Sequence, residues 1–199
     1  MPVLRLLKIQ IDFEVLKMAN TAVVFKSNYG ATRKYAMHIA HALEAELLDM
    51  DRVKKFDFAK YDTVIYGGGI YAGKVNGIKF ISSNAENLAG KTVIIFTTGL
   101  ADPTVAKNAK DILKSLNKSL PKELMSKVHI YNFQGGLDYS KLSFLHKRVM
   151  SMVKKSIEKK CEDERTDNEK GILESYGKNL DLTDMATASP LIDYVKGLK

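Results

Sequence analysis

The sequence predicts an α/β fold, an open parallel sheet with helices on both faces. Short runs of apolar and β-branched residues alternate along the chain with segments in which apolar residues recur at helical spacing. The short runs show no polar–apolar alternation, which indicates strands buried on both faces. Strands that alternate with helices in this way are typical of a parallel sheet whose crossover connections are helical.

Five segments are expected to form the strands, and four of them are clear. The clear ones are Thr21–Phe25, Thr63–Tyr66, Thr92–Phe96 and Val128–Phe133, and a weaker one lies near Leu47–Met50. A first helix carries the apolar stripe Tyr35, Ile39, Ala42, Leu43 and Leu47, and a second carries Ile78, Phe80, Ile81 and Leu88 and ends at Gly90. A third begins at Asp102-Pro103 and closes before Pro121, and a final one spans Pro190 to Lys199 with Leu191, Val195 and Leu198 inward.

Length and composition indicate a single globular domain with an appendage. The chain has 199 residues, of which 45% are hydrophobic and 27% charged. We expect residues 1–18 to be an N-terminal extension of uncertain structure and 19–199 to be one domain. The net charge of +8 favours an anionic partner, a membrane surface or nucleic acid. The single cysteine, Cys161, cannot form a disulfide within the chain, so we expect a reducing cytoplasm.

The segment Ser27-Asn28-Tyr29-Gly30-Ala31-Thr32 joins the first strand to the first helix. A turn followed by the start of a helix leaves backbone N–H groups without partners, and the helix dipole adds positive charge there. The hydroxyls of Ser27 and Thr32 could also donate to a phosphate monoester. The pattern fits a phosphate site, and it equally fits an ordinary helix N-cap.

Glycine and small polar residues follow the other strands at the same predicted edge of the sheet. They are Gly67-Gly68-Gly69-Ile70-Tyr71-Ala72-Gly73, Thr97-Thr98-Gly99-Leu100-Ala101-Asp102 and Gln134-Gly135-Gly136-Leu137-Asp138. Ligands of open α/β sheets bind at the carboxyl ends of the strands, where the strand order reverses. Four such loops at one edge indicate that backbone approaches a flat ligand closely.

Competing motifs fail on particular residues. Gly68 to Lys74 matches the first seven positions of a P-loop, but Val75 stands where the magnesium-binding Ser or Thr is required. His38 and His41 have a spacing that could hold a metal, yet a solvated helix face explains them better, so no metal site is expected. A Ser-His-Asp set cannot be read from the sequence. We therefore expect no catalytic side chain and a cofactor that carries the chemistry.

Three motifs resemble flavodoxins. Ser27-x-Tyr29-Gly30-x-Thr32 resembles their phosphate loop, and the segment Gly-Ile-Tyr-Ala-Gly-Lys at 69–74 resembles the loop beside the flavin ring. Gly136 to Leu145 with the basic helix after it resembles the branch that includes the bacterial menaquinone-dependent protoporphyrinogen IX dehydrogenase. The resemblance covers roughly residues 20 to 160. It implies a flavodoxin-like five-stranded parallel sheet in the order 2-1-3-4-5.

The resemblance implies bound FMN and assigns its contacts. The phosphate would lie on Ser27, Asn28, Tyr29, Gly30, Ala31 and Thr32. The flavin ring would lie along Gly68, Gly69, Ile70, Tyr71, Ala72 and Gly73, and Thr97, Thr98, Gly99 and Leu100 would close its other side. Tyr71 would stack on the ring or remain an exposed loop tyrosine. Asp138 would contact the substrate or cap the following helix, and the cap is the favoured role.

A basic amphipathic helical segment is expected at 139–160. Its apolar residues recur at intervals of three and four, and much of the rest is basic, including Lys147, Arg148, Lys154, Lys155, Lys159 and Lys160. The pattern fits a helix packed on the sheet with a solvated basic face. It also fits a helix at an anionic membrane surface near the flavin.

These observations favour an FMN-dependent oxidoreductase that passes electrons from an organic donor to a quinone or protein acceptor. The resemblance implies protoporphyrinogen IX as one donor, with contact at the inner membrane face. The alternative is a small flavodoxin-type electron carrier with no substrate of its own. A nucleic-acid-binding module is disfavoured, because aromatic residues do not interleave with the basic clusters.

Overall fold

The computed structural model describes residues 20–198, without the side chains of Leu145, Asp167 and Asn168. The predicted extension at 1–18 lies outside the described residues. The elements, with 3-10 helices labelled η, are β1 Thr21–Lys26, α1 Ala31–Leu43, β2 Glu46–Asp49, η1 Phe58–Lys60, β3 Thr63–Tyr71, β4 Lys74–Val75, α2 Lys79–Ser82, β5 Thr92–Gly99, α3 Ala106–Ser119, α4 Lys122–Met125, β6 His129–Gln134, β7 Gly136–Leu137, η2 Tyr139–Lys141, α5 Phe144–Glu158, η3 Glu162–Glu164, α6 Asp167–Glu174, β8 Leu180–Asp181, η4 Met185–Ala188 and α7 Ser189–Lys196.

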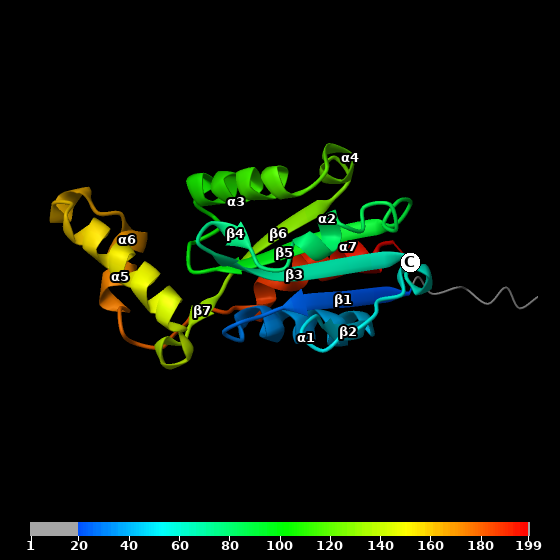
Figure 1. Cartoon of the computed structure of the whole chain (residues 1–199), viewed down its shortest axis with the longest axis horizontal. Coiled ribbons are helices and arrows are strands. Elements are labelled where there is room, and N and C mark those ends of the chain that lie inside the picture. The colour runs from blue at the N-terminus through cyan, green and yellow to red at the C-terminus, as the bar shows by residue number, and fades with distance from the viewer. Residues whose placement is uncertain (1–19, 199) are drawn as a thin grey trace, which may run out of the picture.

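The central sheet has parallel strands in the order β2-β1-β3-β5-β6, and β4 pairs antiparallel with the end of β3 (Figure 1). This confirms the predicted sheet and its order. The strand order reverses between β1 and β3, because β1 is followed by β2 on one side and then by β3 on the other. The loops after these strands are therefore expected to hold a ligand.

Helices cover both faces of the sheet and enclose two apolar clusters. Val23 and Ile65 point to the face covered by α1 and α7, whereas Ala22 and Val64 point to the face covered by α2, α3 and α4 (Figure 1). Successive side chains of a strand point to opposite faces, so buried strands must be apolar at every position. The continuous apolar runs of the sequence have this physical origin.

Two strands are longer than the sequence predicts, because their glycines belong to the sheet. β3 continues through Gly67, Gly68 and Gly69 to Tyr71, and β5 continues to Gly99. A Cβ atom at Gly67 would lie 2.1 Å from Cζ of Phe96, and one at Gly68 would lie 2.6 Å from Cγ1 of Val75. These glycines make room for neighbouring side chains instead of forming a turn.

Three predicted helices differ from those observed. The first, α1, ends at Leu43, so Leu47 of its predicted stripe lies in β2 instead. The second is only Lys79–Ser82 and is followed by turns up to Gly90, since Ser and Asn compete with helix by bonding to nearby backbone. The Asn84 side chain, for example, donates to the carbonyl of Phe80 at 2.8 Å. The last helix, α7, ends at Lys196, so Leu198 is 42% exposed instead of facing inward.

Residues 136–181 form an arm that projects beyond the carboxyl edge of the sheet (Figure 1). The antiparallel pair of β7 and β8 closes its base, and α5 packs on α6 within it. Leu182 N donates to the Gly135 carbonyl at 3.0 Å, so the chain leaves and re-enters the sheet domain at one point. In the described part of the chain, no helix is long and apolar enough to cross a membrane.

Helix α5 does not pack on the sheet, and the interpretation that placed it there is wrong. Among the described residues, α5 adds none to either core cluster. The sheet face next to α1 is covered instead by α7, through Leu191 and Val195. α7 supplies that apolar cover, so the arm is free to extend over the end of the sheet.

Candidate functional site

A hollow of about 630 Å³, counted with its open mouth, lies at the carboxyl edge of the sheet beside the β1/β3 reversal. Five segments line it. Four lie at the ends of sheet strands: residues 29–32 except Gly30, 70–72, 98–100 and 135–137. The fifth comes from the arm and consists of Leu142, just before α5, and residues of the first two turns of α5. The loops that the sequence placed at one edge do converge.

The segment Ser27 to Thr32, called the phosphate loop below, connects β1 to α1. Gly30 adopts φ 98°, which favours glycine, and no side chain caps the helix. Ser27 Oγ instead accepts from Gly30 N at 3.1 Å, which tightens the loop. Within the described residues, the first helical N–H groups, at Ala31 and Thr32, bond to no other part of the chain. The loop therefore offers donors at the positive end of a helix dipole.

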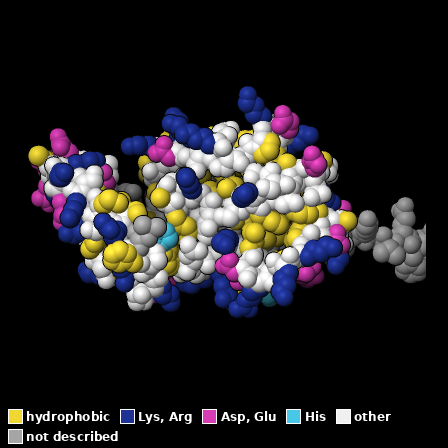
Figure 2. Space-filling model, in the orientation of Figure 1, with side chains coloured by type: hydrophobic (Ala, Val, Ile, Leu, Met, Phe, Trp, Pro, Cys, Tyr) yellow, Lys and Arg dark blue, Asp and Glu magenta, His cyan; other side chains and the backbone are white. Residues whose placement is uncertain are grey.

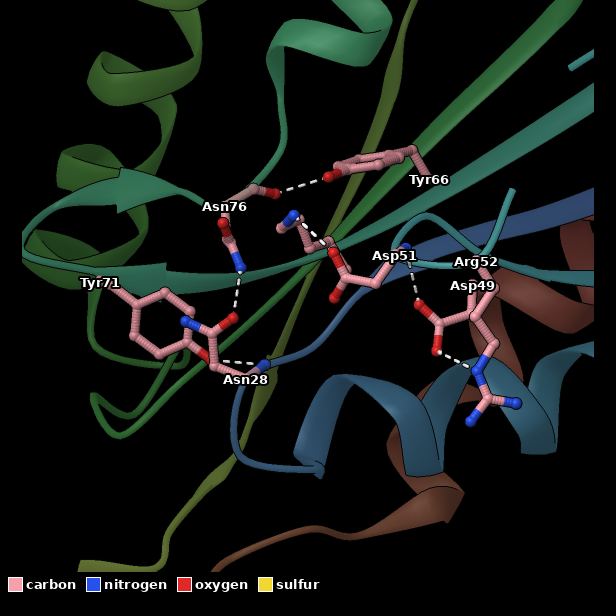
Figure 3. A network of polar contacts seen from close by, with 8 residues as sticks. Asn28, Asp49, Asp51, Arg52, Tyr66, Tyr71 and Asn76 are labelled. Atoms are coloured by element: carbon pink, nitrogen blue, oxygen red, sulfur yellow. Dashed lines mark hydrogen bonds and ion pairs between the residues drawn. The ribbon is translucent and has the colours of Figure 1, made fainter. Parts of the chain in front are cut away.

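The β3–β4 hairpin forms the second wall. Its turn residues Ala72 and Gly73 have φ of 48° and 73°, the signs that a tight hairpin turn requires. Asn76 Nδ2 donates to Asn28 Oδ1 at 3.0 Å, and Asn28 N donates to the Tyr71 hydroxyl at 3.4 Å (Figure 3). These bonds fix the phosphate loop to the hairpin. Asn28 thus braces the loop, and Tyr71 is half-buried in the wall.

Thr98 of β5 and Thr32 of α1 form the floor. Thr32 Oγ1 and Thr98 Oγ1 are 2.7 Å apart and buried, so one hydroxyl donates to the other and one hydrogen remains to donate. Thr97 faces elsewhere and donates to Asn132 Oδ1 at 2.8 Å. Thr98 lines the hollow and Thr97 does not.

The arm supplies a wall that the sequence analysis did not assign to the site. Leu142, His146, Val149 and Met150 reach the hollow from its third side. His146, Val149 and Met150, three and four residues apart, lie on one face of α5, and Leu142 precedes the helix. His146 is the polar member of an otherwise apolar set. A polar residue within such a set was the signal that could have identified this wall.

The predicted cofactor residues divide into two groups. Those that line the hollow are Tyr29, Ala31, Thr32, Ile70, Tyr71, Ala72, Thr98, Gly99 and Leu100. The others are Ser27 and Asn28, which shape the phosphate loop; Gly30, which lines a neighbouring hollow; Gly73, in the hairpin turn; and Gly68, Gly69 and Thr97, buried within strands.

Burial and pairing set the electrostatics around the hollow. Burial raises the pKa of Tyr71 above its usual value, although the N–H of Asn28 opposes the rise. Hydrogen bonds from Lys141 and Ser140 lower the pKa of Asp138 to about 2. Asp138 also accepts from Ser140 N and so caps η2, as expected. At the base of the arm, Lys34 and Thr183 lower the pKa of Asp181 to about 2.

A parallel sheet of this order with a ligand hollow at its β1/β3 reversal defines a flavodoxin-type flavoprotein fold. A family model described as a flavodoxin domain matches residues 22–164. The chain therefore belongs to the flavodoxin-domain family, whose cofactor is FMN. No curated protein matches the sequence.

Solved structures with similar folds include a flavoprotein of Lactobacillus acidophilus in complex with FMN, at 16% identity and a TM-score of 0.42, covering 58% of this chain and 92% of the other. A Fusobacterium nucleatum flavodoxin mutant bound to flavin mononucleotide has 14% identity, a TM-score of 0.35, and coverage of 61% and 78%. An NADH:FMN oxidoreductase in its apo form has 18% identity and a TM-score of 0.39, and the match covers 58% of this chain and 74% of the other. At these values the family assignment depends on the sequence match.

The residues present fit FMN. The free N–H groups at the start of α1 and the spare hydroxyl hydrogen of the Thr32–Thr98 pair suit a phosphate. The aromatic and apolar walls formed by Tyr71, Leu100 and Leu137 suit a flat ring.

Proposed function

We propose that the chain is an FMN-dependent oxidoreductase that passes electrons from an organic donor to a quinone or a protein acceptor. The observation that carries the proposal is the hollow itself, which combines a helix start, whose N–H groups are unpaired among the described residues, with aromatic and apolar walls beside the strand reversal. The flavin supplies the redox centre. The phosphate loop holds it, and the hairpin and β5 orient it.

The finer proposal concerns the donor. The motif that begins at Gly136 and continues into the arm resembles the menaquinone-dependent protoporphyrinogen IX dehydrogenase branch, so protoporphyrinogen IX is the first donor to test. In the structure this motif reaches the hollow through Leu137 and Leu142. A donor that entered from the arm side would meet the flavin there.

We further propose peripheral contact with the inner face of an anionic membrane, through α5. Phe144 is 77% exposed and Met152 is 62% exposed on this helix. Lys147, Arg148 and Lys155 surround them, and Figure 2 shows basic and hydrophobic side chains side by side on the arm. Each basic residue near an anionic surface contributes about 1 kcal/mol. A quinone in the bilayer would then lie close to the hollow.

The test is anaerobic reduction of the purified protein. The protein should be yellow and should release FMN on denaturation. Protoporphyrinogen IX should bleach the flavin, and menaquinone in anionic liposomes should restore its colour faster than menaquinone in neutral liposomes. A colourless protein that takes up no added FMN would refute the cofactor.

The alternative, an electron carrier without its own substrate, gives a different result in the same experiment. Its flavin would be reduced by dithionite or by a reductase and not by protoporphyrinogen IX. Menaquinone would then leave the reduced flavin unchanged, and only a protein acceptor would oxidise it. This outcome would reject the enzyme and retain FMN binding.

A further inference from the structure

Helix α5 places a histidine ring in the hollow that the proposed function does not use. His146 lies in the first turn of α5 and is half-buried. Its companions in this wall, Leu142 before the helix and Val149 and Met150 on it, are apolar. A histidine among them brings hydrogen-bonding atoms to a wall that is otherwise without them.

His146 belongs to a cluster of three rings, called the aromatic triad below. Its ring stacks on Tyr71, with centroids 5.4 Å apart and planes 20° from parallel. Tyr29 stands edge-on to both, at 5.6 Å from Tyr71 and 5.7 Å from His146. Both geometries are favourable for aromatic pairs. The triad thus joins the phosphate loop, the β3–β4 hairpin and the arm, and all three rings line the hollow.

A hydrogen bond fixes the orientation of the histidine. The Tyr29 hydroxyl bonds to His146 Nδ1, across 117 positions of sequence. The geometry allows either group to donate; we assign the hydroxyl hydrogen to Nδ1, which places an imidazole N–H on Nε2. Nε2 bonds to no described residue. His146 therefore offers a free N–H at a hollow with the walls of a flat-ring site.

We propose that His146 is a cofactor-positioning residue, which holds the flavin ring from the arm side. The inference depends on the proposed binding of FMN. The isoalloxazine is flat and is edged by carbonyl oxygens and ring nitrogens, which accept from an N–H. A ring in the hollow contacts Tyr71 on the hairpin and His146 on the arm. Because Tyr29 ties His146 to the phosphate loop, retention of the ring is coupled to retention of the phosphate.

The test measures how fast FMN leaves the full-length, FMN-loaded protein, by dilution and the rise of free flavin fluorescence. His146→Ala should release FMN about tenfold faster, equivalent to about 1.4 kcal/mol. His146→Phe keeps a ring and loses the hydrogen bond, so its release should be intermediate. Tyr29→Phe removes only the bond that orients His146, so its release should be no faster than that of His146→Phe. The double variant Tyr29→Phe/His146→Phe should be no faster than His146→Phe alone, because Tyr29 acts through His146.

The matched control is His38→Ala, because His38 is an exposed histidine on α1, outside the hollow. Its release rate and flavin absorption bands should equal those of the wild type, whereas His146→Ala should shift those bands. Circular dichroism of each variant checks folding, and His146→Phe preserves the test if the alanine variant does not fold. This inference alone would be overturned if the wild-type protein binds FMN but the His146 variants release it within twofold of the wild-type rate and leave its spectrum unchanged. Wild-type protein without FMN would overturn the proposed function first.

Discussion

Gly67 shows how a single missing side chain shapes the site. It lies in the middle of β3, where a Cβ atom would fall 2.1 Å from Cζ of Phe96 and 2.6 Å from its Cε1. The Phe96 ring is fully buried in the cluster beneath α1 and α7. The glycine lets this ring lie flat against the strand just before the hairpin. The strand below the hollow is therefore fixed by close packing.

Gly67→Ala should destabilise the protein by about 1–3 kcal/mol, the usual cost of overpacking a core. Urea unfolding followed by circular dichroism measures the change. Gly171→Ala is the matched control, because its Cβ would meet nothing within 4 Å on α6. There alanine should leave stability unchanged or raise it by up to about 1 kcal/mol through helix propensity. Equal stabilities of the two variants would contradict the packing role of Gly67.

At the scale of elements, α5 and α7 have similar apolar periodicity and different roles. α7 buries Leu191 and Val195 against the sheet, whereas α5 leaves Phe144 and Met152 exposed. Lys154 and Lys160 pair with Glu158 and Glu169 inside the arm, each at 2.5 Å, so they are partly neutralised. Among the described residues, Lys147, Lys155 and Lys159 form no ion pair. These three lysines lie on or just after the helix that carries the exposed Phe144 and Met152.

Replacing Phe144 and Met152 together by serine should weaken binding to anionic vesicles about tenfold or more, since each apolar side chain contributes roughly 1.5–3 kcal/mol when fully buried. Sedimentation with phosphatidylglycerol vesicles measures this. Leu113→Ser changes an apolar residue that is also exposed, on α3 of the sheet domain, and should bind vesicles as the wild type does. If the wild-type protein does not bind anionic vesicles, the membrane contact is refuted.

The sequence was sufficient for the parallel sheet and for the loops that meet at the hollow, because hydrophobic periodicity and strand ends are local properties. The strand order followed from the resemblance to flavodoxins. The sequence did not show that Gly67 to Gly69 belong to a strand, because glycine is equally typical of a turn and of a close approach. The structure shows a close approach, since Phe96 and Val75 occupy the space next to Gly67 and Gly68. The sequence was also insufficient for α5. An amphipathic pattern states that a face will be covered, and it does not state by which element.

At the scale of the whole molecule, the arm behaves as an insertion into a complete domain. Its two ends meet where Leu182 N donates to the Gly135 carbonyl. Both core clusters are built without it, among the described residues. The Lys34–Asp181 ion pair at its base is more than half exposed, so it contributes about 0–1 kcal/mol. The sheet domain is thus expected to fold without the arm.

Replacing residues 136–181 by a short glycine–serine turn should leave a domain that unfolds cooperatively. It should still bind FMN, because the phosphate loop, hairpin and β5 remain, but with lower affinity, because one wall of the hollow is gone. Thermal unfolding and an FMN titration provide the readouts. An aggregated or non-cooperative product would show that the arm supports the core.

The position of α7 after the arm has a consequence during synthesis. The sheet face of Val23, Ile65 and Ile94 has α1 as its first cover and receives the second, α7, only when residue 196 has been translated. Ribosomes add about 5–20 residues each second, so the interval from the last sheet strand to α7 lasts on the order of several seconds. During that interval a nascent sheet leaves part of this apolar face open. Such a chain is a natural client for chaperones that bind near the ribosomal exit.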